Sequence, residues 1–246
     1  MSPLAISLIA LCVIFGGGLI GVFLPGHRLP EETKDVVRLG AGLIGTIAGL
    51  VLGLLIGSAN SSYETQSNQV RKMTADVILL DDLLGQYGPQ THKARALLRA
   101  SIQPFVARVW NAESKQTEPF KPTAEGEALY LEIDRLAPQD DTQRSIKTRA
   151  LAIFIDLAQT RLLLQQSALG SLPMPFLIVL VAWLAIIFLS FGLYARHDYS
   201  VLIALFVFAL SASGSLFLIL ELTHPFAGLL RIPSEPVLNA LVPLGG

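Results

Sequence analysis

The chain has 246 residues, of which 52% are hydrophobic and only 15% are charged, whereas soluble domains carry about 25% charged residues. Its net charge of −1 excludes the strongly basic surface that duplex nucleic acid requires, so no nucleic-acid partner is expected. A single cysteine, Cys12, excludes a disulfide framework and a thiolate metal cluster. The composition therefore indicates a membrane protein, with the lipid bilayer as its expected partner.

The first predicted span is an uncharged run at residues 3–24, which ends at Pro25. At about 1.5 Å per residue, this run is long enough to cross a ~30 Å hydrocarbon layer as a helix. A cleaved signal peptide is the alternative, but no Lys or Arg precedes the run, which exceeds the usual ~7–15 apolar residues. We expect a short polar connection to follow, with Arg28, Lys34 and Arg38.

The second predicted span is the uncharged stretch at residues 39–60. One face of this helix carries almost no side chains, because glycines recur at every fourth position and Ser61 continues the row: Gly45, Gly49, Gly53 and Gly57. Such a stripe lets another backbone approach closely, so we expect a helical neighbour there. A column of branched apolar residues lies on a different face: Ile47, Val51 and Leu55.

The same span contains the dinucleotide-binding spacing Gly40-x-Gly42-x-x-Gly45. That motif needs a preceding strand, a phosphate in water at a helix N-terminus, and an acidic residue about 20 positions later. A membrane span offers none of these, so we expect no cofactor.

A helical soluble domain is predicted at residues 61–172, with 13 basic and 13 acidic residues. Apolar residues alternate there at steps of three and four, which is typical of a helix packed against others in water: Val70, Met73, Val77, Leu80, Leu84 and Tyr87. This heptad seam should end at Gly88-Pro89. Further helices are expected at residues 90–111, with a kink at Pro104, at 124–136 and at 141–169, with a loop at 113–123.

Two more spans are predicted at residues 172–195 and 201–220, joined by the turn Arg196-His197-Asp198. Four prolines make a continuous helix unfavourable in the remaining tail. The predicted architecture is an all-α membrane protein with four transmembrane helices in two pairs and a helical domain between helices 2 and 3. Its domains are the first helix pair (1–60), the helical domain (61–172), the second pair (173–222) and the tail (223–246).

Residues 52–73, LGLLIGSANSSYETQSNQVRKM, resemble the end of the second span of bestrophin chloride channels. The counterparts are Gly57, Asn60, Tyr63, Glu64 and Arg71. The segments LLDDLLGQYGP, ARALLR and LILELTHPFAGLLRIPSEP resemble the bacterial bestrophin-like family more closely. Its tail motif covers Glu221, Pro225, Phe226 and Gly228, and this chain has Thr223 where the family usually has Asp.

The resemblance implies a homo-oligomer, a pentamer if it follows bestrophins, whose second span lines an ion pore. It places Ile47, Val51 and Leu55 at a hydrophobic neck, which can gate an inorganic anion by dewetting. The alternative is that these three residues face lipid or pack within one protomer. Charges near the spans are balanced between the two sides, so the resemblance alone places the domain and both termini in the cytoplasm of a bacterial cell.

Other polar residues are weighed as sites. Glu221, with His224 three residues later, lies at the end of a span, where a carboxylate is a candidate functional group or a solvated anchor in the interface. Asp81 and Asp82 are expected on a solvated face beside the seam.

No enzyme chemistry is predicted. His27, His92 and His197 have no second histidine at i+4, so no metal site is expected, and no catalytic constellation is found. The predicted function is an oligomeric, anion-conducting, bestrophin-like channel. The alternative is a non-conducting membrane scaffold or sensor whose helical domain binds a partner.

Overall fold

The computed structural model describes residues 2–24, 30–110, 124–168, 174–195, 198–226 and 228–239. These residues form helices connected by turns, with no strand among them, and four of the helices are long and apolar enough to cross a membrane. The predicted all-α class is confirmed. Several expectations fall outside the described residues, namely the loop at 113–123 and those for Pro25, His27, Arg28, Arg196 and His197.

Two compact units make up the chain. Met1–Ser62 and Ser171–Thr223 form the first, which we call the membrane unit. Tyr63–Gly170 and His224–Gly246 form the second, which we call the helical unit. One continuous helix, α2 (Glu31–Tyr87), contributes residues to both. Its 57 residues are more than twice the ~20 that a membrane span needs.

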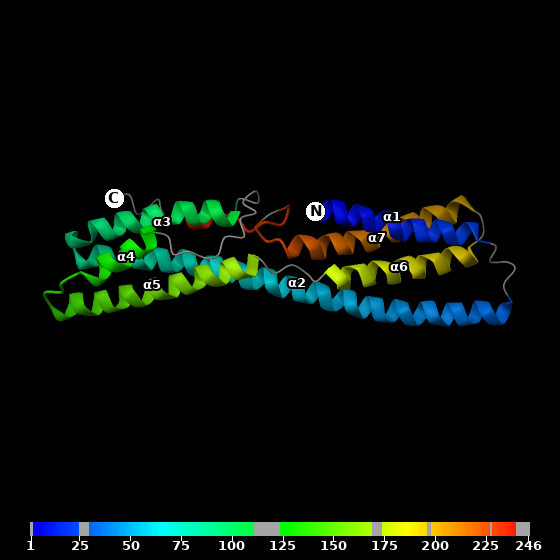
Figure 1. Ribbon diagram of the computed structural model, residues 1–246, viewed down its shortest axis with the longest axis horizontal. Helices are drawn as coiled ribbons and strands as arrows, with labels where there is room; N and C mark the ends of the chain where they lie inside the picture. Colours follow the sequence, from blue (N-terminus) through cyan, green and yellow to red (C-terminus); the bar gives the residue numbers. More distant parts are fainter. Residues whose placement is uncertain are drawn as a thin grey trace. The chain divides into compact units, whose positions relative to one another are not determined.

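The membrane unit contains α1 (Pro3–Phe23), the first part of α2, α6 (Met174–Tyr194) and α7 (Tyr199–Leu222). Figure 1 shows α1, α6 and α7 side by side, and α1 packs against both α6 and α7. Helix α1 begins where the Ser2 hydroxyl accepts a hydrogen bond from the Ala5 backbone N–H (3.3 Å) and Pro3 occupies the first turn. Its inward face is fully buried at Ile14.

Glycines bring α1 and α6 into close contact. A Cβ added to Gly17 would lie 2.7 Å from the carbonyl oxygen of Ala185. A Cβ on Gly21 would meet the carbonyl oxygen of Leu189, and one on Gly192 would meet that of Gly18. Only residues without a side chain let the two backbones approach this far. The tight crossing is therefore made by α1 and α6, which sequence reasoning did not single out.

Buried hydroxyls in the membrane unit have backbone partners. Ser213 of α7 donates a hydrogen bond to the Ser7 carbonyl of α1 (2.6 Å), and Ser190 donates to the Ile187 carbonyl within α6 (2.6 Å). A hydroxyl in a hydrocarbon layer has no water to bond, so these contacts satisfy groups that would otherwise be costly to bury.

Helix α2 begins earlier than the sequence predicts. The polar connection expected before Leu39 is wrong in part, because Glu31–Arg38 already form about two helical turns. The backbone N–H groups of Thr33 and Lys34 bond the Pro30 carbonyl (3.0 and 3.1 Å) and start the helix. Acidic residues at this end favour the helix because its N-terminus carries a partial positive charge.

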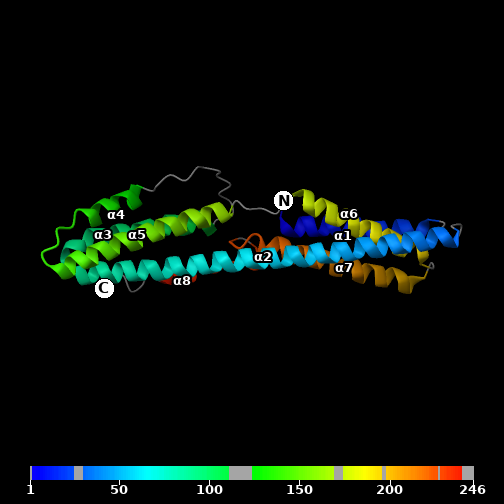
Figure 2. The same cartoon turned by 90° about the horizontal axis from the view of Figure 1, so that it is seen from below.

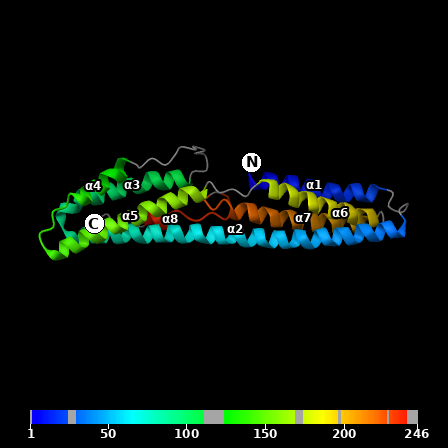
Figure 3. The same ribbon diagram turned by 60° about the horizontal axis from the view of Figure 1, so that its bottom comes forward.

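The helical unit combines the second part of α2 with α3 (His92–Trp110), α4 (Ala124–Asp134), α5 (Asp141–Ala168) and the short α8 (Glu235–Asn239). Figures 2 and 3 show α3, α4 and α5 grouped beside this part of α2. All six residues of the predicted seam are buried, with exposures of 0 to 3%. The seam prediction is confirmed, and α3 runs unbroken through Pro104.

The end of α2 follows the predicted stop. Gly88 has φ 125°, a conformation that only glycine adopts at low cost, and the 3-10 turn η2 (Pro89–Thr91) follows. The Thr91 hydroxyl then donates a hydrogen bond to the Leu84 carbonyl (2.5 Å). This bond satisfies one of the carbonyls that every helix end leaves without an intrahelical partner.

The tail packs into the helical unit. Phe226, Ile232 and Val237 belong to its buried core. The indole N–H of Trp110 donates to the Ile232 carbonyl (2.7 Å), and its ring meets that of Phe226 edge to face, with centroids 5.2 Å apart. Trp110 of α3 therefore holds the tail against the helical unit through one hydrogen bond and one aromatic contact.

Asp81 does not lie on a solvated face as predicted. It is 4% exposed, and the Arg95 guanidinium donates two hydrogen bonds to its carboxylate (2.8 and 2.6 Å). These bonds raise the pKa of Arg95 above its ordinary value. The prediction was wrong because the partner is on the next helix, 14 positions later. Asp82 is exposed, as expected.

Candidate functional site

Helix α2 is the span that its own protomer covers least. Only 6% of its most apolar window is buried, against 33% in α1, 33% in α6 and 28% in α7. The face of α2 that packs against the core of the membrane unit is carried mainly by Ile44, Ala48, Val51, Leu52 and Leu55. The rest of this apolar helix is left exposed within one chain.

The three predicted neck residues do not share one environment. Ile47 is 41% exposed, whereas Val51 and Leu55 are half-buried against the core of the membrane unit. Successive residues four positions apart rotate by about 40° around a helix, so the column drifts from the open face toward the packed face. A neck at these positions stays a prediction, whereas Val51 and Leu55 are seen to pack within the protomer.

A second apolar column on α2 is more exposed than the predicted neck. Leu43, Leu50 and Leu54 are exposed by 65, 66 and 67%, and sequence reasoning did not single them out. The sequence signal that could have found them is their spacing of seven and four residues, which keeps them on one helix face. They compete with the predicted column for the role of lining an oligomer axis.

The glycine stripe of α2 is open within the chain. A Cβ on Gly49, Gly53 or Gly57 would meet no atom within 4 Å, and one on Gly45 would reach only Ile187 Cδ1 at 3.9 Å. Among the described residues, the close helical neighbour that the stripe predicts is absent. A neighbour outside the protomer or lipid is left to fill that face.

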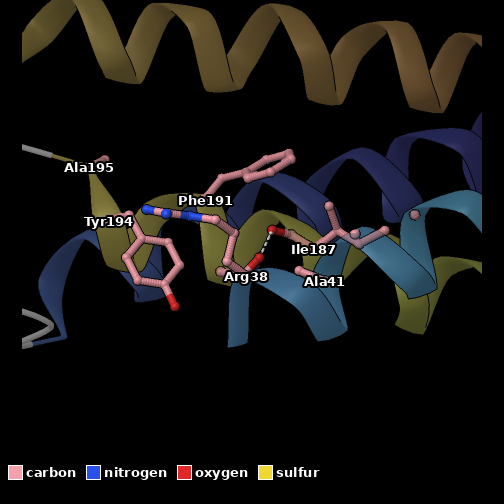
Figure 4. A pocket seen from close by; sticks show the side chains of 9 residues that line it. Arg38, Ala41, Ile187, Phe191, Tyr194 and Ala195 are labelled. Carbon is pink, nitrogen blue, oxygen red and sulfur yellow. Dashed lines mark hydrogen bonds between the residues drawn. The ribbon is translucent and has the colours of Figure 1, made fainter. Parts of the chain in front are cut away.

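A groove of about 530 Å³ lies in the membrane unit between the start of α2 and the end of α6. Figure 4 shows Arg38 and Ala41 from α2 facing Ile187, Phe191 and Tyr194 from α6. The Arg38 guanidinium carbon lies 5.6 Å from the centre of the Tyr194 ring, a favourable cation–π contact. The groove therefore joins an apolar wall to one positive charge.

The α2 residues that resemble the bestrophin motif lie at and beyond the end of the membrane span. Asn60, Glu64 and Arg71 are exposed, and Tyr63 is half-buried against the core of the helical unit. Asn60, Glu64 and Arg71 lie within about 40° of one another around the helix, on one exposed face, and Tyr63 lies about 60° to one side of Asn60. The structure of the single chain assigns them no shared role.

The tail-motif residues have distinct structural places. Glu221 is 2% exposed at the end of α7, so the interpretation of its carboxylate as a solvated anchor is wrong. Phe226 and Pro225 are also buried, and Gly228 has φ 98°. The positive φ explains why glycine suits this turn. Burial of a carboxylate at a span end keeps Glu221 a candidate functional group.

Charged residues of α2 and α5 meet in the helical unit. Lys72 bonds Asp156 at 3.5 Å, and Asp76 lies nearby with one carboxylate oxygen buried and without a hydrogen-bond partner among the described residues. Burial raises the pKa of Asp76 above 3.8, Lys72 lowers it and Asp156 raises it, with a net rise. Asp76 lies 16 residues beyond the uncharged stretch at 39–60, outside the span.

Comparison with known proteins supports the resemblance. Residues 7–237 match the bestrophin-like domain. A crystal structure of a bacterial bestrophin homolog from Klebsiella pneumoniae, in a variant with one tryptophan replaced by alanine, is similar with a TM-score of 0.71 and 15% identity, over 100% of this chain and 99% of that chain. The zinc-phased structure of the homolog gives 0.67 and 16%, over 97% and 98%. No curated protein matches this chain in sequence.

Proposed function

We propose that this chain, which belongs to the bestrophin-like family, is the subunit of an oligomeric ion channel that conducts anions. The observation that carries the proposal is the exposure of α2, an apolar span that its own protomer leaves almost uncovered. The similarity to a bacterial bestrophin homolog over the whole chain supports the same arrangement. A pentamer is the assembly that the bestrophin comparison favours.

The α2 surface has two properties that a central helix of such an oligomer needs. The glycines at 49, 53 and 57 leave room for a close neighbouring backbone. The exposed apolar side chains of α2 can form a ring that water wets poorly, and such a ring controls conduction without any charge. We assign that ring to Ile47, Val51 and Leu55, of which the last two would present only their exposed parts.

The orientation is also part of the proposal. The helical unit and both termini lie in the cytoplasm, which the bestrophin resemblance supports. A reporter fused after Gly246 should therefore be active on the cytoplasmic side, and activity only on the opposite side would contradict this orientation.

The experiment is conductance of purified protein in planar bilayers. Replacing Ile47, Val51 and Leu55 together by Ala should widen the constriction and make it easier to wet, so the current should rise. Replacing Leu43, Leu50 and Leu54 by Ala is the matched comparison, because it removes similar apolar volume from the neighbouring α2 column. This variant should leave the current near wild type if Ile47, Val51 and Leu55 form the ring.

A charge at the ring tests selectivity. Val51→Glu should shift conduction toward cations, because a ring of carboxylates repels chloride at short range. A rise in current only in the Leu43, Leu50, Leu54 variant would move the ring to that column. No current from the wild type or from the variant with all three neck residues replaced, in an oligomer that size analysis shows to be intact, would favour the alternative of a non-conducting scaffold.

A further inference from the structure

The groove between α2 and α6 is shaped by residues that lack side chains. A Cβ on Gly42 would meet no atom within 4 Å, and one on Gly45 would meet only the tip of Ile187. Around this space the wall is apolar, with Ile187 and Phe191 from α6, and Phe191 is 50% exposed. The groove therefore opens toward the surroundings of the membrane unit.

Arg38 places a positive charge at one end of the groove. It is the last charged residue before the uncharged stretch at 39–60, so it lies at the level where a span meets the headgroups. Tyr194 supports it from α6, and the Tyr194 hydroxyl donates to the Lys34 carbonyl (2.8 Å). Tyrosine is the side chain that prefers this depth.

The Arg38 guanidinium has hydrogen-bond capacity to offer. The Asp35 carboxylate lies 3.7 Å from the Arg38 guanidinium, and both side chains are about 70% exposed. That separation is longer than a hydrogen bond, and an exposed pair of this kind contributes little. A guanidinium donates through five N–H groups in a planar fork that suits a phosphate.

We propose that this groove binds one anionic phospholipid, with its phosphate on Arg38 and the first part of an acyl chain along Gly42 and Gly45. Gly45 lies seven positions after Arg38, which is a rise of about 10 Å along the helix, or about a third of a ~30 Å hydrocarbon layer. The groove therefore holds the part of the acyl chain next to the headgroup. A free phosphate would leave the apolar wall unused. One positive charge at the headgroup level above an apolar wall matches the two parts of an anionic phospholipid, and coverage by a second copy is the alternative that cross-linking detects.

Lipid binding of this kind is independent of ion conduction. It requires only that α2 and α6 cross the membrane. The lipid proposal can therefore be refuted without refuting the proposed channel, and the channel can be refuted without refuting lipid binding. A basic side chain at the membrane surface attracts an anionic headgroup, with a modest gain for each charge.

The test is native mass spectrometry of the full-length purified protein titrated with palmitoyl-oleoyl phosphatidylglycerol or with the matching phosphatidylcholine. The wild type should retain one phosphatidylglycerol per subunit. Gly42→Leu fills the groove and should lose it. Gly40→Leu is the matched control, because a Cβ there also meets nothing within 4 Å but Gly40 does not line the groove.

A second variant tests the positive charge of Arg38 separately from the open volume of the groove. Arg38→Gln should weaken phosphatidylglycerol binding by about fivefold and remove the preference over phosphatidylcholine, and it does not depend on whether Gly42→Leu folds. Equal retention of phosphatidylglycerol by the wild type, Gly42→Leu and Arg38→Gln would overturn the proposal. So would a photo-crosslinker at position 41 that labels a second subunit instead of lipid, because a neighbouring copy would then cover the groove.

Discussion

Replacing Gly17 by Ala tests the close crossing of α1 and α6. The new Cβ would lie 2.7 Å from the Ala185 carbonyl oxygen, and ordinary van der Waals contact begins at 3.4 Å. The two backbones must therefore separate locally by about 0.7 Å (3.4 − 2.7). A backbone carbonyl in a helix cannot rotate away from the methyl group as a flexible side chain could, so the helices themselves must shift.

The size of the effect follows from two opposing contributions. Overpacking a well-packed interior costs about 1–3 kcal/mol, and the higher helix propensity of Ala offsets about 1 kcal/mol of it. Gly16→Ala is the matched control on the same helix, since its Cβ meets no atom within 4 Å. The propensity gain is common to both variants, so Gly17→Ala should be less stable than Gly16→Ala by about 1–3 kcal/mol.

The measurement is unfolding of the purified protein in mixed micelles with increasing SDS, followed by far-UV circular dichroism. Size analysis of the same samples shows whether assembly has changed, which separates a loss within the protomer from a loss of contacts between copies. If the two variants agree within about 0.5 kcal/mol, the usual range of a substitution away from packed sites, the close contact at Gly17 is refuted.

Two further predictions concern the helical unit. Arg95→Met should cost about 3 kcal/mol of stability, because it leaves the buried Asp81 carboxylate without its cation. The control Lys93→Met should cost less than about 1 kcal/mol, because Lys93 is 70% exposed where it meets Glu132. Equal losses of unfolding free energy in the two variants, measured by chemical denaturation, would contradict this prediction. Asp76→Asn should stabilise the protein at pH 7. The pKa of Asp76 is raised above 3.8 in the folded state, so ionisation of Asp76 weakens the fold as pH rises from 3.8 through the folded-state pKa. The gain in stability from Asn should disappear below pH 3.8, where Asp76 is protonated in both states. A gain that persists there would have another cause.

The sequence by itself determined the spans and the heptad seam. Uncharged runs longer than 20 residues fix where a helix can cross a membrane, because the energy of a charge in hydrocarbon dominates every local preference. The alternating steps of three and four residues fixed the buried face from Val70 to Tyr87, because helical geometry alone places those positions on one side. Gly88 and Pro89 fixed the end of α2 for reasons that are equally local.

What covers an apolar or small face was decided only by the tertiary structure. The stripe at Gly49 and Gly53 and the pair Gly17 and Gly21 follow the same spacing of four, yet the first is open within the chain and the second meets the α6 backbone. Asp81 likewise is buried beside Arg95 because α3 turns back along α2. Periodicity shows which residues share a face, and the partner of that face depends on contacts distant in sequence, which no local pattern encodes.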